Sequence, residues 1–143
     1  MSIKEPETKP DFDARVAEKA VDLYLKNIEL VKALAASYKF KYQFYWQPTM
    51  FGKNKLSEYE KAEYEDQKHL EKVYKETYRI VREKTTSLRD DKSFHDLSDI
   101  FLHEEAPIYI DWMHLSEQGN AAIARAIADK VSHLFQRGIE TVE

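Results

Sequence analysis

A short segment with strand periodicity lies between two long segments with helical periodicity, and this order constrains the fold most. Aromatic residues occupy every second position from Phe40 to Trp46, a pattern that predicts a β-strand over residues 40–46. Gln47-Pro48 ends the strand, because proline cannot donate a hydrogen bond to a sheet. Alternation of helices with strands is typical of α/β proteins with a parallel sheet. Strands of a parallel sheet need neighbouring strands and are buried on both faces. Because this sequence contains only one strong strand pattern, we expect its sheet to be incomplete.

Two long helices are predicted on either side of this strand. Apolar residues recur three and four positions apart between residues 12 and 38, which predicts an amphipathic helix over that range. Ser57 and Glu60 form a Ser-x-x-Glu capping box, so a second helix is expected over 57–84. Its apolar stripe is narrow and the rest is dense in glutamate and lysine, which favours a surface helix packed on one side.

The C-terminal part of the chain alternates shorter elements. Residues 85–92 are predicted to be a polar loop, 94–102 either an edge strand or a helical turn, and 107–111 a short extended stretch. A final amphipathic helix is expected to begin at about Ser116 and to end near Gly138, since glycine is favoured just beyond a helix C-terminus.

Length and composition narrow the classes of protein to consider. The 143 residues suffice for one domain, and a net charge of -4 with lysines spread among glutamates argues against nucleic-acid binding. There is no cysteine and no Gly-rich phosphate-binding motif, and no cofactor is expected. No apolar run has the length of a transmembrane helix, and the polar N-terminal segment lacks a signal-peptide core. We therefore expect no membrane association and, for the sequence as written, a cytoplasmic location.

The stretch from Tyr109 to Asn120 contains the arrangement with the clearest chemistry. Asp111 precedes His114 by three residues on a turn that leads into the final helix, a spacing that can place the carboxylate against the imidazole. The carboxylate would favour the tautomer protonated at Nδ1 and leave Nε2 free to take a proton from a nucleophile. By itself, Asp-x-x-His is also typical of a helix-capping aspartate beside a surface histidine.

The surrounding sequence resembles the SGNH (GDSL-type) hydrolases. Residues 109–120, Tyr-Ile-Asp-Trp-Met-His-Leu-Ser-Glu-Gln-Gly-Asn, are similar to the family's final conserved block, where Asp and His three apart are followed by a Gly and an amphipathic helix. The segment 44–60 is similar to the fourth strand and following loop in a subset of the family. Residues 96–98 together with Phe101 resemble the segment before the final block. The likeness spans roughly residues 13–137.

The resemblance implies roles for individual residues in the hydrolysis of acyl esters, without metal or cofactor. His114 would be the general base and then the acid toward the leaving alcohol, and Asp111 would orient it. Gly119 would let the start of the final helix pack closely. Gln47, at the end of the predicted strand, is either a site-lining residue or a strand-end residue that bonds to a loop.

Three of the four marker blocks of the family do not occur in this sequence. There is no Gly-Asp-Ser with the nucleophile, and the blocks with the Gly and the oxyanion-hole Asn are also missing. A base contributes roughly 10²–10⁴ in rate and an oxyanion donor about 10²–10³, so a His–Asp pair without the other groups is a weak catalyst. The chain is therefore expected to be inactive as an esterase by itself.

These observations predict a helix-rich α/β chain with a partial flavodoxin-like SGNH-hydrolase fold and an incomplete parallel sheet. Residues 1–12 are expected to be a disordered lead-in, 13–138 the C-terminal part of the hydrolase-like domain, and 139–143 a tail. The open edge of the 40–46 strand would pair with a complementing N-terminal half or with a second copy of the chain. The alternative function is a non-catalytic interaction protein that binds or self-associates through this edge.

The remaining histidines suggest no further site. His95 and His103 lie near several acidic residues, but their spacings fit no established metal-ligand pattern, and no metal site is expected. His69 and His133 are predicted to be surface residues. The tyrosines of residues 59–78 are predicted to contribute to packing.

Overall fold

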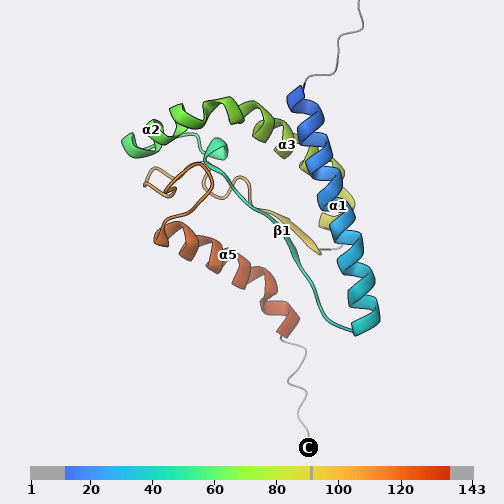
Figure 1. Ribbon diagram of the computed structural model, residues 1–143. Helices are drawn as coiled ribbons and strands as arrows, with labels where there is room; N and C mark the ends of the chain where they lie inside the picture. The colour runs from blue at the N-terminus through green and yellow to red at the C-terminus, as the bar shows by residue number, and fades with distance from the viewer. Residues whose placement is uncertain (1–11, 91, 136–143) are drawn as a thin grey trace, which may run out of the picture.

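The computed structural model describes residues 12–90 and 92–135, and it combines long helices with a small parallel sheet (Figure 1). The elements follow in the order α1 (Phe12–Tyr38), β1 (Phe44–Trp46), η1 (Met50–Gly52), α2 (Glu58–Gln67), η2 (Lys68–Leu70), α3 (Glu71–Lys84), α4 (Thr86–Asp90), β2 (Phe94–Asp96) and α5 (Glu117–Phe135), where η denotes a single turn of 3₁₀ helix. This order confirms the helix-rich α/β character that the sequence predicts. Among the described helices, none has the length and apolarity needed to cross a bilayer.

The sheet of the described chain consists of β1 and β2 in parallel. Phe44 lies opposite Phe94 and Trp46 opposite Asp96. The strand predicted over residues 40–46 is therefore too long, because only its last three residues enter the ladder. The partner strand limits the ladder at its start: β2 begins at Phe94, and Lys92 just before it has φ 60°, so no strand residue of the described chain lies opposite residues 40–43.

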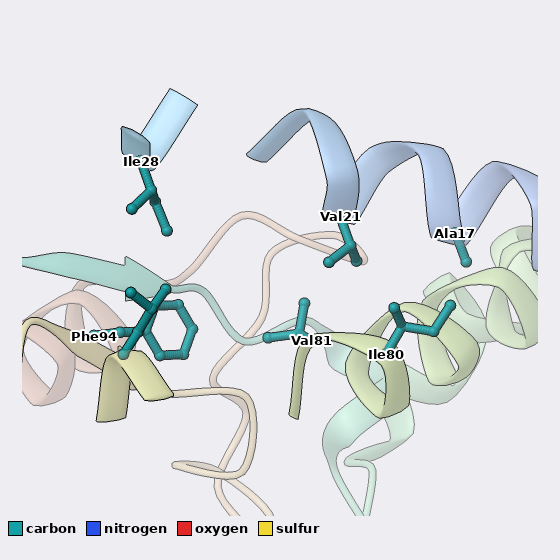
Figure 2. Close-up of a cluster of buried hydrophobic side chains, with 7 residues drawn as sticks. Ala17, Val21, Ile28, Ile80, Val81 and Phe94 are labelled. Carbon is teal, nitrogen blue, oxygen red and sulfur yellow. The ribbon is translucent and has the colours of Figure 1, made fainter. Parts of the chain in front are cut away.

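A hydrophobic cluster joins α1, α3 and β2. The buried side chains of α1 point toward those of α3 and β2 (Figure 2). The cluster consists of Ala17, Val21, Ile28, Ile80, Val81, Leu88 and Phe94. Burial of an aliphatic or aromatic side chain of this kind contributes about 1.5–3 kcal/mol, so this cluster fixes α1 and α3 on one side of the strands. In the view of Figure 1, α5 lies on the other side of the strands from α1.

Helix α1 carries a second apolar stripe that the described residues leave uncovered. Val16 and Leu34 are 42% exposed, and Leu23 and Leu30 are 60% exposed. Their separations of seven and four residues place them on one face of the helix. A helix that is apolar on two sides normally lies between two layers of a protein.

The helix predicted over residues 57–84 is divided in the structure. The capping box of Ser57 and Glu60 begins α2 as predicted, but Gln67 leaves the helical conformation with φ -107° and ψ 7°. The 3₁₀ turn η2 separates α2 from α3. Because of this division, α3 packs along α1 while α2 packs against the loop that follows β2.

The predicted polar loop over residues 85–92 is corrected by burial, whereas both alternatives predicted for residues 94–102 occur. Residues 86–90 form α4 instead of a polar loop, since Leu88 belongs to the first hydrophobic cluster. The segment 94–102 combines both alternatives, with a strand over its first three residues and turns after it. At the N-terminus, α1 already includes Phe12 of the predicted lead-in. The remainder of that lead-in, the predicted helix end at Gly138 and the tail lie outside the described residues.

Candidate active site at the Asp111–His114 turn

The structure brings Asp111 and His114 together as the sequence predicts. Nδ1 of His114 lies 2.7 Å from Oδ2 of Asp111. The other carboxylate oxygen, Oδ1, accepts hydrogen bonds from the backbone N–H groups of Met113 at 2.9 Å and of His114 at 2.7 Å. The carboxylate therefore closes the turn and bonds the imidazole. It does not cap the final helix, which begins at Glu117 and has the Ser116 hydroxyl as acceptor for Gly119 N at 3.3 Å.

Protonation of the pair follows from these contacts. Partial burial alone would raise the pKa of Asp111, but hydrogen bonds from the backbone N–H groups of His114 and Met113 and from the imidazole outweigh it and lower the pKa from 3.8 to about 2. Asp111 is thus an anion at neutral pH, and Nδ1 must donate the hydrogen bond to it. Nε2 of His114 has no hydrogen-bond partner within residues 12–90 and 92–135, and the side chain is 71% exposed. The geometry presents an accessible basic nitrogen.

A small hairpin-like loop carries the pair. Tyr109 and Leu115 form an antiparallel bridge, with hydrogen bonds from Ile110 N to His114 O at 2.8 Å and from Ser116 N to Ile108 O at 2.7 Å. These bonds close the loop over residues 109–115, which we call the catalytic loop after the role proposed for it below.

Gly119 at the start of α5 allows the close packing that was predicted for it. A Cβ atom at this position would lie 2.8 Å from Cγ2 and 3.1 Å from the carbonyl oxygen of Ile108. The absence of a side chain therefore lets α5 approach the base of the catalytic loop.

Glu60 has a role in this region that its capping-box motif does not predict. Its Oε1 accepts hydrogen bonds from the backbone N–H groups of Ile108 at 2.9 Å and Tyr109 at 3.1 Å. Its Oε2 accepts from Lys53 Nζ at 2.7 Å and from Ser57 N at 2.9 Å. The side chains of Glu60 and Lys53 are both fully buried. The capping-box motif predicts the bond between Glu60 and Ser57 N, but it does not indicate the bonds of Glu60 to other parts of the chain.

Charge in this buried cluster is compensated. Burial would raise the pKa of Glu60, but hydrogen bonds from Lys53 and from the backbone N–H groups of Ser57, Ile108 and Tyr109 together lower it. The Lys53 ammonium donates a second hydrogen bond, to the carbonyl oxygen of Ala106 at 2.6 Å. The segment that leads into the catalytic loop is therefore bonded to both members of one buried ion pair.

Other contacts hold the outer part of the catalytic loop. The Tyr59 hydroxyl donates to the carbonyl oxygen of Ile110 at 2.5 Å. The backbone N–H of Met50 donates to the carbonyl oxygen of Trp112 at 3.0 Å. The Trp112 ring lies 5.2 Å from the Tyr74 ring of α3, centre to centre. The loop is thus attached to α2, α3 and the segment that follows β1.

Gln47 lines a groove whose lining includes neither Asp111 nor His114. Gln47 is exposed and makes no hydrogen bond to either of these residues, and the groove, of about 570 Å³, lies between α1, α3 and the end of β1. The groove is largely apolar, and Tyr74 connects its wall to Trp112. The lining residues are Val16, Ala20, Tyr24, Tyr45, Trp46, Gln47, Thr49, Leu70, Val73, Tyr74, Thr77 and Tyr78.

The other histidines have ordinary surroundings. Nε2 of His95 lies 2.6 Å from Oε1 of Gln43, and His103 is exposed. In the part of the chain that the structure describes, no three His, Asp or Glu residues are arranged to hold a metal ion. The side chain of His133 lies outside the described residues. Tyr64, Tyr74 and Tyr78 pack as predicted, against Phe51 or within the core.

Comparison of the chain with protein-family models, with curated proteins and with solved structures finds no match. The resemblance to SGNH hydrolases therefore depends on the motif residues alone.

Proposed function

We propose that this chain carries the general-base half of an SGNH-type ester hydrolase, in a partial flavodoxin-like fold. The observation that carries the proposal is the 2.7 Å bond between His114 Nδ1 and the Asp111 carboxylate, with Nε2 exposed and without a partner among the described residues. An imidazole held in this way is suited to remove a proton from a hydroxyl nucleophile.

In the proposed reaction, Nε2 of His114 takes the proton of a serine hydroxyl as its oxygen attacks the acyl carbon. Asp111 stabilises the imidazolium that forms, and the imidazolium then protonates the leaving alcohol. Water, deprotonated by the same nitrogen, releases the acyl group in the second half of the reaction. The serine and the oxyanion donors must come from other polypeptide, because the sequence contains no Gly-Asp-Ser and no Gly-x-Asn-Asp.

Two surfaces support the proposal that a complementing half binds here. Phe44 N donates to Ser93 O and Trp46 O accepts from Leu97 N, so the backbone groups of Tyr45 point away from β2. The carbonyl oxygen of Tyr45 already accepts a hydrogen bond from the Tyr24 hydroxyl at 3.2 Å, so the N–H of Tyr45 is the group of this outer edge that another strand could bind. The uncovered apolar stripe of α1 lies on a helix that packs on the same small sheet. A second layer of structure would cover both.

The test is intact-mass analysis after treatment with a fluorophosphonate. The chain alone is expected to give no adduct. Co-expression with the polypeptide encoded directly upstream is expected to give one adduct, on a serine of that polypeptide, which disappears with His114→Ala and persists with His103→Ala. An adduct on the isolated chain, or one in the complex that survives His114→Ala, would contradict the proposal.

A second candidate function is a non-catalytic interaction protein. The open edge of β1 and the exposed stripe of α1 favour it, since uncovered surfaces of this kind are typical of binding sites. It predicts a stable complex that gives no fluorophosphonate adduct and whose affinity is unchanged by His114→Ala. The hydrolase proposal predicts an adduct in the same complex, so one sample distinguishes the two.

A further inference from the structure

We infer that the first turn of α2 positions the catalytic base: Glu60 and Tyr59 hold the catalytic loop in the conformation in which Asp111 selects the Nδ1–H tautomer of His114. The catalytic meaning of this inference rests on the proposed function, whereas the contacts themselves do not. No hydrogen bond or ion pair of the described structure joins either residue to the imidazole, so both are positioning residues.

Glu60 has more bonds than a helix cap requires. A capping box needs one side-chain oxygen, which here accepts from Ser57 N. The second oxygen of Glu60 is directed at two consecutive backbone N–H groups, those of Ile108 and Tyr109. Only a carboxylate can accept on both oxygens at once, because one side of a glutamine amide is a donor. The second carboxylate oxygen of Glu60 therefore binds the segment that leads into the catalytic loop.

Ile108 and Tyr109 connect Glu60 to the turn that carries His114. Tyr109 forms the bridge with Leu115 that closes the catalytic loop, and Ile108 O accepts from Ser116 N on the other side. Two residues beyond Tyr109 is Asp111. Tyr59 adds a bond to the carbonyl oxygen of Ile110 between them. Residues 108, 109 and 110 are therefore each bonded to α2.

Loss of these bonds has a specific chemical consequence. When the loop moves, the carboxylate of Asp111 leaves Nδ1 of His114, and the neutral imidazole is free to carry its proton on Nε2 instead. Nε2–H is a donor and cannot act as a base. Glu60→Gln should therefore change the tautomer in molecules that are still folded, which a loss of global stability alone would not do.

The experiment is NMR of the chain labelled with ¹⁵N at histidine, which reports the tautomer of each imidazole. The His114 signal is assigned by its absence in His114→Ala. The wild type is expected to show Nδ1–H at His114, and Asp111→Asn supplies the reference for its loss. Glu60→Gln is expected to lower the ratio of Nδ1–H to Nε2–H several-fold. Asp96→Asn, a matched change at a carboxylate that caps Ser98 and pairs with Arg82, should leave the ratio unchanged.

Tyr59→Phe provides a variant that does not disturb a buried charge, because Tyr59 is 53% exposed. It should lower the same ratio less strongly and speed hydrogen exchange at Ile110 N relative to Tyr38→Phe, whose tyrosine is 76% exposed. A wild-type ratio in folded Glu60→Gln would overturn the inference. If Glu60→Gln does not fold, wild-type values in Tyr59→Phe would overturn it.

These outcomes are independent of hydrolase activity. If the tautomer responds as expected but the complex gives no fluorophosphonate adduct, the proposed function fails while the positioning role stands. If the adduct forms normally and the tautomer ratio of His114 is unchanged in Glu60→Gln and Tyr59→Phe, the positioning role is wrong while the proposed function stands.

Discussion

At the residue scale, Asp111 combines two tasks that are often separate. One oxygen stabilises the backbone turn through two N–H groups, and the other orients the imidazole. Both tasks require the ionised form, so the turn and the tautomer of His114 depend on the same charge. The stability of the protein should therefore depend on pH through the ionisation of Asp111.

We expect wild-type stability to fall relative to Asp111→Asn as the pH drops from about 4 toward 2. The pKa of Asp111 is about 2 in the folded protein, below the value of about 3.9 for an unfolded chain. A lowered pKa contributes stability that is complete above the unfolded value and is lost as the pH falls through the folded value. Urea unfolding of both proteins at several pH values between 5 and about 2 measures the difference. A constant difference across this range would contradict the assignment.

The buried partner of Glu60 gives the second prediction at this scale. Lys53→Met is expected to lower the free energy of unfolding by about 3–5 kcal/mol, because it leaves the carboxylate of Glu60 buried and unpaired. Lys55→Met is the matched control: its ion pair with Glu105 is exposed, and its loss should change stability little. Urea unfolding measures both. Similar losses for the two variants would show that the buried pair does not stabilise the fold.

The sequence was sufficient to predict the local parts of the site. Asp111, His114 and Gly119 lie within nine residues of each other, and their relation depends on one turn. Glu60 could be predicted only as a helix cap, because its second role joins it to backbone groups 48 and 49 residues away. Lys53 has no local signal, and nothing in its surroundings in the sequence distinguishes it from the exposed Lys55.

At the scale of elements, the helices with the strongest periodicity were the most predictable. The bounds of α1 agree with the predicted helix, since its buried stripe is continuous. The break between α2 and α3 was not predictable, because it occurs where two halves of one polar segment pack on different neighbours. The shortness of β1 has a similar cause, since the length of its ladder depends on β2.

The contact between α5 and the catalytic loop predicts an unusual response to an alanine. Alanine favours helices over glycine by about 1 kcal/mol, yet Gly119→Ala should destabilise the protein by roughly 1–3 kcal/mol because its Cβ would overlap the buried Ile108. Gln118→Ala, at the exposed neighbouring position, should stay within about 0.5 kcal/mol of wild type. Thermal unfolding measures both. Stabilisation by Gly119→Ala would mean that α5 does not pack as closely as described.

The two apolar stripes of α1 predict very different losses of stability when one residue of each is replaced by alanine. Ile28 is 1% exposed, so Ile28→Ala is expected to cost about 2–5 kcal/mol of unfolding free energy. Leu30, two positions further, is 60% exposed, so Leu30→Ala should change it by less than about 0.5 kcal/mol. Urea unfolding of the isolated chain measures both values. A large cost at Leu30 would mean that its stripe is already covered.

At the scale of the whole molecule, the described chain combines a loop that is bonded to several elements with a sheet of only two strands. The catalytic loop is fixed by α2, α3 and the start of α5, whereas β1 keeps an open edge and α1 an uncovered face. The number of strong strand patterns in the sequence predicted this imbalance. What would cover these surfaces could not be predicted, because an exposed strand edge and an exposed apolar stripe are compatible with many partners.

The open edge makes a last prediction about association. Because the N–H of Tyr45 points away from β2, Tyr45→Pro removes a donor from the outer edge without removing a bond of the β1–β2 ladder. We expect the isolated chain to self-associate at high concentration, and Tyr45→Pro to weaken this association several-fold. Tyr45→Phe keeps the N–H and should behave as wild type. Sedimentation equilibrium measures the three proteins. Equal association of all three would show that the contact does not use the N–H of Tyr45, and a monomeric wild type would remove the edge as a docking surface between copies.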